Sequence, residues 1–281
     1  MKNILLPLLL ISLMFISCQS NTQTKEEETE KQVQSERYRI EMQTTQGTMI
    51  LELYNETPKH RDNFVKLTEE GAFDSLLFHR VIENFMIQGG DPDSRNAGPD
   101  DTLGNGDRDY RVDAEFRPNL FHKKGVLAAA RDGNLERASS AMQFYIVQGK
   151  IFNDSLLQKA EERINGWMAV NQARKDTANL LLSIALEKAV EDGDMETYRV
   201  YNDSLKRLGM INQSFELYQI PEKQKEVYKT LGGAPHLDQN YTVFGEVVQG
   251  LEVVDSIATV PTGNFDRPLE DVRIIKVMVL K

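Results

Sequence analysis

The segment Phe78-His79-Arg80-Val81-Ile82-Glu83-Asn84-Phe85-Met86-Ile87-Gln88-Gly89-Gly90-Asp91 decides the fold. Its apolar runs predict two short strands, over residues 76–82 and 85–89. Successive side chains of a strand point to opposite faces, so Met86 and Gln88 share a face, whereas His79 points away from Arg80. We therefore expect His79 to be a buried, hydrogen-bonded core residue, with Arg80 on the other face of its strand.

Strand patterns continue on both sides of this segment. Apolar and polar residues alternate over 38–42 and again over 49–53, and Gln46-Gly47 turns the chain between them. Further strands are expected over residues 125–130, 143–147, 241–248 and 272–280. One helix should begin at Thr57-Pro58 and end at Gly71, and another should span residues 250–260. This pattern predicts a mainly β fold with helices: a closed eight-stranded antiparallel β-barrel capped by two helices.

One long segment, residues 154–231, departs from the strand pattern. It contains a single proline, Pro221, and apolar residues recur in it at helical spacing, as at Leu156, Ala160 and Ile164. We expect three or four helices, forming a helical insertion within a domain of residues 37–281. Its role stays open between a packing appendage and a lid or docking surface for unfolded proteins.

The first 36 residues predict export. Lys2 is followed by an apolar run that is too short to span a bilayer but is typical of a secretory signal, and Cys18 stands where cleavage would occur. This pattern resembles a bacterial lipoprotein signal. Residues 1–17 are therefore expected to be a signal peptide, with Cys18 lipidated, and polar residues 18–36 a flexible tether. Ordinary secretion, with Cys18 incidental, is the alternative.

The formal net charge of −10 and the absence of basic clusters argue against nucleic-acid binding. A lone cysteine forms no internal disulfide, and the four histidines lack metal-ligand spacing. The acidic loop around Asp100, Asp107 and Asp109 lacks the spacing of a calcium-binding EF-hand and is better explained as a solvated turn region. We expect no metal and no cofactor.

The segment quoted first resembles the central motif of cyclophilins, a family of peptidyl-prolyl cis-trans isomerases. Further matches follow in the family's order, and together they cover both sides of the helical segment. They are Gly125-Val126-Leu127-Ala128-Ala129-Ala130, Gln143-Phe144-Tyr145-Ile146-Val147, Leu237-Asp238 and Val243-Phe244-Gly245. An ordered set of this kind is far more specific than any one short motif.

The resemblance implies a catalytic role for Arg80, whose permanently charged guanidinium offers several N–H donors in one plane. It implies that Phe85, Met86, Tyr145 and Leu237 hold the proline ring, and that Gln88, Ala130 and Gln143 contact the peptide. Tyr241 occupies a position where many members carry a pocket histidine. The alternative for Phe85 and Met86 is ordinary core packing.

Some residues depart from the family pattern. His236 replaces a frequent tryptophan, Tyr145 a frequent phenylalanine, and Arg131 a common asparagine. A cyclosporin-type ligand is therefore a candidate partner, but His236 is expected to weaken its binding. Arg131 could alter how the groove edge holds the substrate backbone.

Two functions follow. The first is a lipid-anchored peptidyl-prolyl isomerase on the extracytoplasmic side of a bacterial membrane, periplasmic or at the cell surface, acting on unfolded or proline-containing polypeptides. The second is a proline-peptide-binding or chaperone module with weak or no catalysis.

Overall fold

The computed structural model describes residues 36–280, of which residues 37–280 belong to one compact unit. The expected signal peptide, tether and Cys18 lie outside the described residues, except for Glu36. Within the described part of the chain, no helix is both long enough and apolar enough to cross a membrane.

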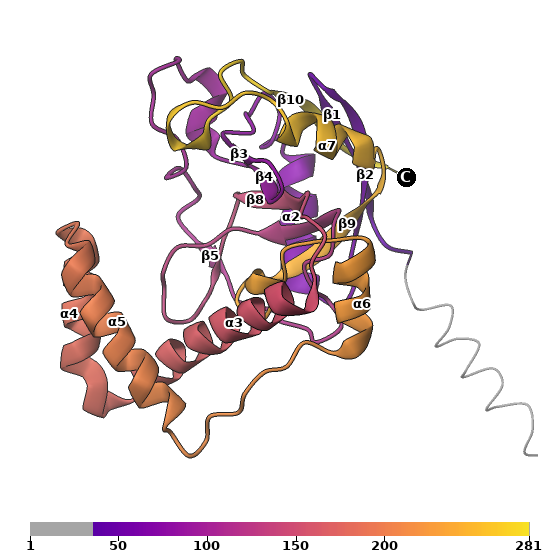
Figure 1. Cartoon of the computed structure of the whole chain (residues 1–281). Helices are drawn as coiled ribbons and strands as arrows, with labels where there is room; N and C mark the ends of the chain where they lie inside the picture. The colour runs from indigo at the N-terminus through magenta and orange to yellow at the C-terminus, as the bar shows by residue number, and fades with distance from the viewer. Residues whose placement is uncertain (1–35, 281) are drawn as a thin grey trace, which may run out of the picture. The chain divides into compact units, whose positions relative to one another are not determined.

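One antiparallel sheet of eight strands dominates the unit (Figure 1). In spatial order its strands are β10 (Ile274–Leu280), β1 (Arg39–Thr44), β2 (Gly47–Leu53), β9 (Val243–Gln249), β6 (Val126–Ala129), β8 (Phe144–Val147), β4 (Met86–Gly89) and β3 (Arg80–Ile82). A separate two-stranded sheet pairs β5 (Arg111–Val112) with β7 (Ser139–Ser140).

The expectation of a closed barrel is wrong, because the eight-stranded sheet is an open, strongly curled half-barrel. Its edge strands β10 and β3 do not pair with each other. Irregular chain bridges part of the gap through single contacts, such as the hydrogen bond from Phe78 N–H to Val272 O. The expected strand 76–82 forms a ladder only from Arg80 onward, so the edge strand is too short to complete the ring. Closure depends on strand tilt and stagger as well as on strand number, and alternation along the chain predicts only the number.

Six helices occur in the described residues, where two capping helices and an inserted helical segment were expected. Two of them, α2 (Pro58–Glu69) and α7 (Leu251–Ala258), pack against the sheet. The other four lie between β8 and β9: α3 (Asp154–Arg174), α4 (Leu180–Glu191), α5 (Met195–Met210) and α6 (Glu222–Thr230). Short 3-10 turns occur at η1 (Pro92–Asn96), η2 (Thr177–Asn179), η3 (Pro235–Leu237) and η4 (Asn264–Asp266).

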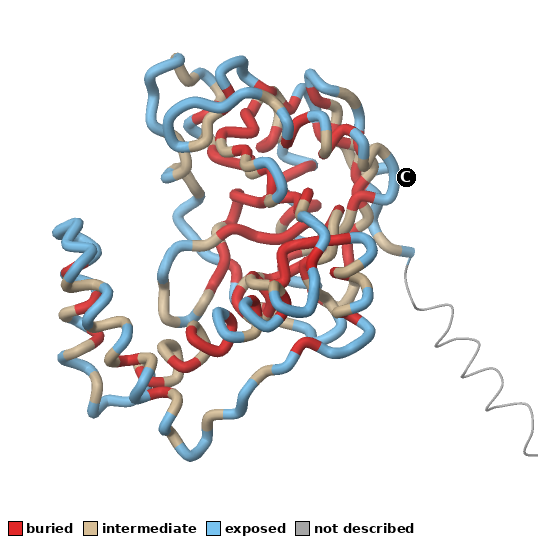
Figure 2. Tube along the Cα trace, in the orientation of Figure 1, coloured by how far each residue is buried: buried red, intermediate tan, exposed pale blue. Residues whose placement is uncertain are grey.

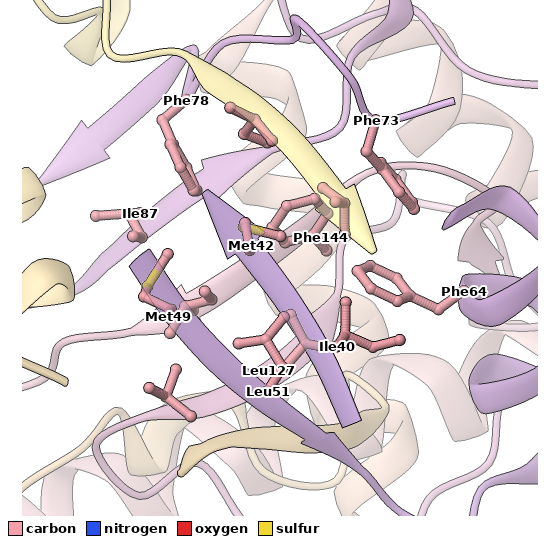
Figure 3. Packing of buried hydrophobic residues seen from close by; sticks show 14 of the residues in the cluster. Ile40, Met42, Met49, Leu51, Phe64, Phe73, Phe78, Ile87, Leu127 and Phe144 are labelled. Atoms are coloured by element: carbon pink, nitrogen blue, oxygen red, sulfur yellow. The ribbon is translucent and has the colours of Figure 1, made fainter. Parts of the chain in front are cut away.

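The main core lies inside the curl of the sheet, under α2 and α7. There the inward side chains of the strands meet phenylalanines such as Phe64, Phe73 and Phe144 (Figure 3). The ring of Phe64 stacks on that of Phe73 at 4.7 Å between centroids and meets Phe144 edge-on at 5.6 Å. Such pairs add to the stabilisation that comes from burying apolar area. The outer face of the sheet carries a second apolar cluster, which includes Met86, Tyr145 and Leu237.

The four helices between β8 and β9 divide into two packing groups. Helix α6 and the first half of α3 share a buried cluster around Tyr228 and Ile164. Helices α4 and α5 pack with the second half of α3 around Leu186 and Leu205. Figure 2 shows that α4 and α5 remain largely exposed along their outer faces.

Candidate active site

Strand register brings the central motif residues into one row on the outer face of the sheet. Arg80 in β3 pairs with Gln88 in β4, Gln88 pairs with Tyr145 in β8, and Tyr145 pairs with Ala128 in β6. Directly paired residues of an antiparallel sheet point to the same face. The neighbouring residues Val81, Ile87, Phe144 and Ile146 therefore point to the main core, where all four are buried.

This row borders a cavity of about 190 Å³, which we call the small cavity. It is smaller than the pockets of about 300–1,000 Å³ that hold whole small molecules, so it suits a single ring or side chain. The residues that line it are Arg80, Phe85, Met86, Gln88, Ala130, Arg131, Tyr145, Leu237 and Tyr241. Eight of the nine residues expected for catalysis and substrate binding thus lie together, and Arg131 joins them.

Arg80 lies at the rim of the small cavity, with its side chain 41% exposed. Its Nε donates to Asp266 Oδ2 at 3.3 Å, and its Nη1 donates a long hydrogen bond of 3.4 Å to Gln88 Oε1. No contact to another described residue is recorded for Nη2. The guanidinium is therefore tethered on two sides and still has N–H groups available for a ligand.

Gln143 is the one expected residue that does not line the small cavity. Its Nε2 donates to the carbonyl oxygens of Gly104 and Gly106 at 2.9 and 2.8 Å, and its Oε1 accepts from Gln88 Nε2 at 3.1 Å. Both ends of the amide are thus engaged within the protein. In this structure Gln143 orients Gln88 and holds the 104–106 loop.

A larger and more polar cavity, of about 820 Å³, adjoins the small cavity and shares Gln88, Ala130 and Arg131 with it. Part of its wall is the acidic loop. Within that loop Asp107 accepts the backbone N–H groups of Ala141 and Met142. Among the described residues, no group of three or more His, Cys, Asp or Glu side chains gathers as a metal site. Asp107 thus fastens the loop to the chain that precedes β8.

Of the residues that depart from the family pattern, Arg131, Tyr145 and Tyr241 line the small cavity, and His236 packs against Phe85, which also lines it. The ring of His236 lies 5.3 Å from that of Phe85, and burial lowers the pKa of His236 from 6.5 to about 4. The ring is therefore neutral near pH 7 and contributes an apolar face. Arg131 donates to the backbone and side-chain oxygens of Asn240 at 2.8 and 2.7 Å, and its guanidinium lies 5.0 Å from the centre of the Tyr241 ring.

A buried chain of hydrogen bonds runs from the floor of the small cavity to helix α6. The Tyr145 hydroxyl lies 2.9 Å from His122 Nε2, and His122 Nδ1 lies 2.8 Å from Asp238 Oδ1. Asp238 Oδ2 accepts the Tyr228 hydroxyl at 2.7 Å. A carboxylate accepts Nδ1–H, so a neutral His122 ring presents Nε2 as the acceptor for Tyr145. We call these four residues, all buried, the tyrosine relay.

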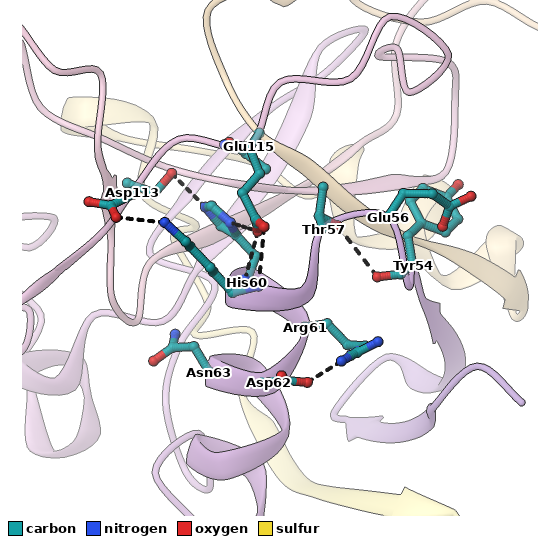
Figure 4. Close-up of polar contacts among 12 residues, drawn as sticks. Tyr54, Glu56, Thr57, His60, Arg61, Asp62, Asn63, Asp113 and Glu115 are labelled. Carbon is teal, nitrogen blue, oxygen red and sulfur yellow. Dashed lines mark hydrogen bonds and ion pairs between the residues drawn. The ribbon is translucent and has the colours of Figure 1, made fainter. Parts of the chain in front are cut away.

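The remaining histidines differ in their partners. His60 contacts Glu115 at 2.8 Å and Ser139 at 2.9 Å, and this holds the start of α2 against the chain after β5 (Figure 4). His79 is buried, as expected, but neither of its ring nitrogens has a hydrogen-bond partner among the described residues, so the expectation of hydrogen bonding is wrong. Burial lowers the pKa of His79 from 6.5 to about 4, because the charged ring would lose its water.

Several residues of the site were not predicted from the sequence. They are Asp266, which pairs with Arg80 across 186 positions, and His122 and Tyr228 of the tyrosine relay, which meet Asp238 across 116 and 10 positions. For Asp238, the adjacent Leu237 of the Leu-Asp motif was the available signal. For the others no local pattern distinguishes them from ordinary polar residues.

Comparisons with known proteins agree on this architecture. The family model described as cyclophilin type peptidyl-prolyl cis-trans isomerase/CLD matches residues 39–279. A Staphylococcus aureus (strain USA300) protein, provisionally named a peptidyl-prolyl cis-trans isomerase, is 29% identical over 245 residues, which cover 87% of this chain and 92% of the relative. A Staphylococcus epidermidis protein with the same provisional name is 28% identical over the same shares.

Among solved structures, the chain is similar in fold to a cyclophilin-type peptidyl-prolyl cis-trans isomerase of Cryptosporidium parvum. The TM-score is 0.50 at 17% sequence identity, and the match covers 87% of this chain and 98% of that one.

Proposed function

The chain belongs to the family of cyclophilin-type peptidyl-prolyl cis-trans isomerases, and we propose that it catalyses this reaction through Arg80, on proteins exported from the cytoplasm. It is thus an enzyme of the isomerase class, whose substrates are peptide bonds that precede proline. The proposal concerns which residue accelerates the rotation, and where in the cell it does so.

The reaction makes modest chemical demands. Rotation about an X-Pro bond is slow because the nitrogen lone pair is delocalised into the carbonyl, which gives a barrier of about 18–20 kcal/mol. A donor aimed at the nitrogen stabilises the twisted bond, in which the lone pair is localised. Each ~1.36 kcal/mol removed from the barrier is tenfold in rate, so five decades require about 7 kcal/mol. Preorganised hydrogen bonding in a partly dry groove is a usual source of so large an effect.

The observation that carries the proposal is the position of Arg80 beside the small cavity. Phe85, Met86 and Leu237 contribute apolar walls in which a proline ring would lose contact with water. The guanidinium at the rim would then face the imide nitrogen of that ring, and the contacts with Asp266 and Gln88 limit how far it can swing away. A donor held in place before the bond twists favours the transition state over the flat ground state.

Substitution of Arg80 by alanine tests this role. Loss of one preorganised donor typically costs about 10²–10³-fold in rate, so Arg80→Ala should lower kcat/KM by at least that factor. Arg80→Lys should recover only part of the loss, because an ammonium lacks the planar set of donors. The measurement is NMR exchange or protease-coupled isomerisation of a proline peptide. Circular dichroism of each variant checks that the fold is intact.

Arg39→Ala is a matched control. Arg39 is also an exposed strand arginine paired with a carboxylate, Glu52, but it does not line the small cavity. This variant should keep the parental rate. Equal rates for Arg80→Ala and the parent would refute the role of Arg80.

Such a result would favour the second candidate, a proline-peptide-binding or chaperone module. The observation in its favour is the set of exposed apolar side chains on α4, such as Leu181 and Ile184, which are 83% and 51% exposed. Large exposed apolar residues of this kind are suited to binding unfolded chains.

We further propose that Cys18 carries a lipid that anchors the enzyme to a bacterial membrane on its extracytoplasmic side, either periplasmic or at the cell surface. The support is the apolar run before Cys18 and the polar stretch after it. Labelling with radioactive palmitate should mark the parent protein and not Cys18→Ala. Equal labelling of both would refute the anchor and leave the isomerase proposal untouched.

A further inference from the structure

A third cavity lies where the helices between β8 and β9 meet the edge of the groove. Its volume is about 560 Å³, and we call it the helical cavity. Its apolar lining is Trp167, Val170, Leu186, Val190, Tyr198 and Tyr241. All but Tyr241 come from α3, α4 and α5.

The helical cavity adjoins the small cavity, and the two share lining residues. Arg131 and Tyr241 each line both cavities, and the guanidinium of Arg131 contacts the aromatic ring of Tyr241. Trp167 also packs against the apolar cluster that contains Tyr145 and Leu237. An extended chain advances about 3.3 Å per residue, so a peptide with its proline in the small cavity would reach the helical cavity within a few residues.

The polar groups of the helical cavity suit a peptide backbone. The side-chain amides of Asn171 and Asn202 line it, and neither has a hydrogen-bond partner recorded among the described residues. The Arg174 side chain is only 11% exposed, and its Nε is buried without a partner in the part of the chain described. The amides of Asn171 and Asn202 can each donate to and accept from the backbone of a bound peptide.

The charges around the helical cavity argue against an anionic or cationic small ligand. Its lining contains two arginines, Arg131 and Arg174, and three acidic residues, Asp132, Glu187 and Glu191. Arg174 is already paired with Glu187. With charge nearly balanced and an apolar floor, selection by hydrophobic side chain is the physical expectation.

We propose that the helical cavity is a second substrate site, which binds the polypeptide segment adjoining the proline and holds an apolar or aromatic side chain of that segment. The inference rests on the proposed function, since it assigns the small cavity to the proline. The helices between β8 and β9 thereby select which prolines the enzyme acts on.

The test compares peptides that contain one proline. A short peptide fills only the small cavity, and longer peptides extend beyond the proline on either side with leucine or phenylalanine, or with serine, at successive positions. NMR exchange measures kcat/KM for each. The extended apolar peptides should exceed both the short peptide and the serine peptides by about tenfold, and the side of the extension that matters gives the direction of binding.

Val190→Asp should remove most of this gain, because it places a carboxylate on the apolar lining, and it should leave the short peptide unaffected. Val200→Asp is the matched control: Val190 and Val200 are 57% and 59% exposed, but Val200 does not line the helical cavity. Since both side chains are exposed, neither variant should impair folding.

The outcomes separate the two proposals. If the short peptide is isomerised but apolar extension brings no gain, or if Val190→Asp and Val200→Asp reduce the gain equally, the second site is refuted and the isomerase assignment stands. If the enzyme isomerises no proline peptide, short or long, the proposed function itself fails.

Discussion

The tyrosine relay gives a prediction that links helix α6 to the floor of the small cavity. In Tyr228→Phe the Tyr228 hydroxyl is lost, and Asp238 Oδ2 loses the only hydrogen-bond partner recorded for it among the described residues. Asp238 is buried, with its side chain 2% exposed, so water cannot readily replace the lost donor. The carboxylate remains in place with one oxygen unsatisfied.

The expected cost follows from that geometry. A hydrogen bond to a charged group contributes about 1.5–3 kcal/mol to stability. The cost of losing it is greater when the acceptor stays buried and unpaired. We therefore expect Tyr228→Phe to lower the free energy of unfolding by about 2 kcal/mol. For a chain of this size that corresponds to a fall in melting temperature of roughly 4–8 °C.

Urea unfolding followed by circular dichroism measures this loss, and Tyr201→Phe is the control. Tyr201 is a partly buried tyrosine of α5 for which no hydroxyl contact is recorded among the described residues, so its variant should be nearly neutral. Tyr145→Phe, at the other end of the relay, should also destabilise, because His122 Nε2 loses its partner. If the relay acts as one unit, the double variant should lose less than the sum of the single losses. Equal effects of Tyr228→Phe and Tyr201→Phe, or strict additivity of the pair, would contradict this account.

Three further predictions concern packing, pH and ligand binding. Gly209→Ala should lower the free energy of unfolding by about 1–3 kcal/mol, because the added Cβ would collide with the backbone of α3. The control is Gly166→Ala, whose Cβ would meet only a flexible lysine side chain at 3.2 Å, and it should be neutral or stabilising by up to about 1 kcal/mol. The urea concentration at the midpoint of unfolding measures both effects. The pKa of His79 is about 4 in the folded protein and 6.5 in the unfolded chain. As pH falls below 6.5, the unfolded chain therefore binds a proton that the folded protein does not, which favours unfolding. About 3 kcal/mol of stability present above pH 6.5 is lost by about pH 4. Unfolding measured from pH 4 to 7 should be flatter in His79→Met, and an unchanged slope would count against the assignment. His236→Trp should tighten the binding of a cyclosporin-type ligand in a fluorescence titration, and unchanged or weaker binding would refute the expected effect of this position.

Much of the fold was predictable from the alternation of apolar and polar residues along the chain and from the glycines and prolines at turns and helix ends. Strand periodicity correctly indicated eight strands of one antiparallel sheet, and the helical spacing after Asp154 matches the helices α3 to α6. Both are local properties, since a strand or helix face repeats every two or about 3.6 residues. The same reasoning put Met86 and Gln88 on one face, and both line the small cavity.

The sequence alone also determined the family, through the order of its motifs, and it identified most of the residues around the small cavity. It could not determine whether the two edge strands meet, since closure depends on tilt and stagger over the whole sheet. Nor could it show that Gln143 is engaged within the protein, or that His79 lacks a hydrogen-bond partner within residues 36–280.

Contacts between distant segments decided the rest. Arg80 meets Asp266 across 186 positions of the chain, and His122 meets Asp238 across 116. The helical cavity likewise exists only because α3, α4 and α5 fold back beside Arg131 and Tyr241. Local patterns report which face of an element is apolar, but such pairs form only when the packed elements bring their side chains together, so only the tertiary structure could reveal them.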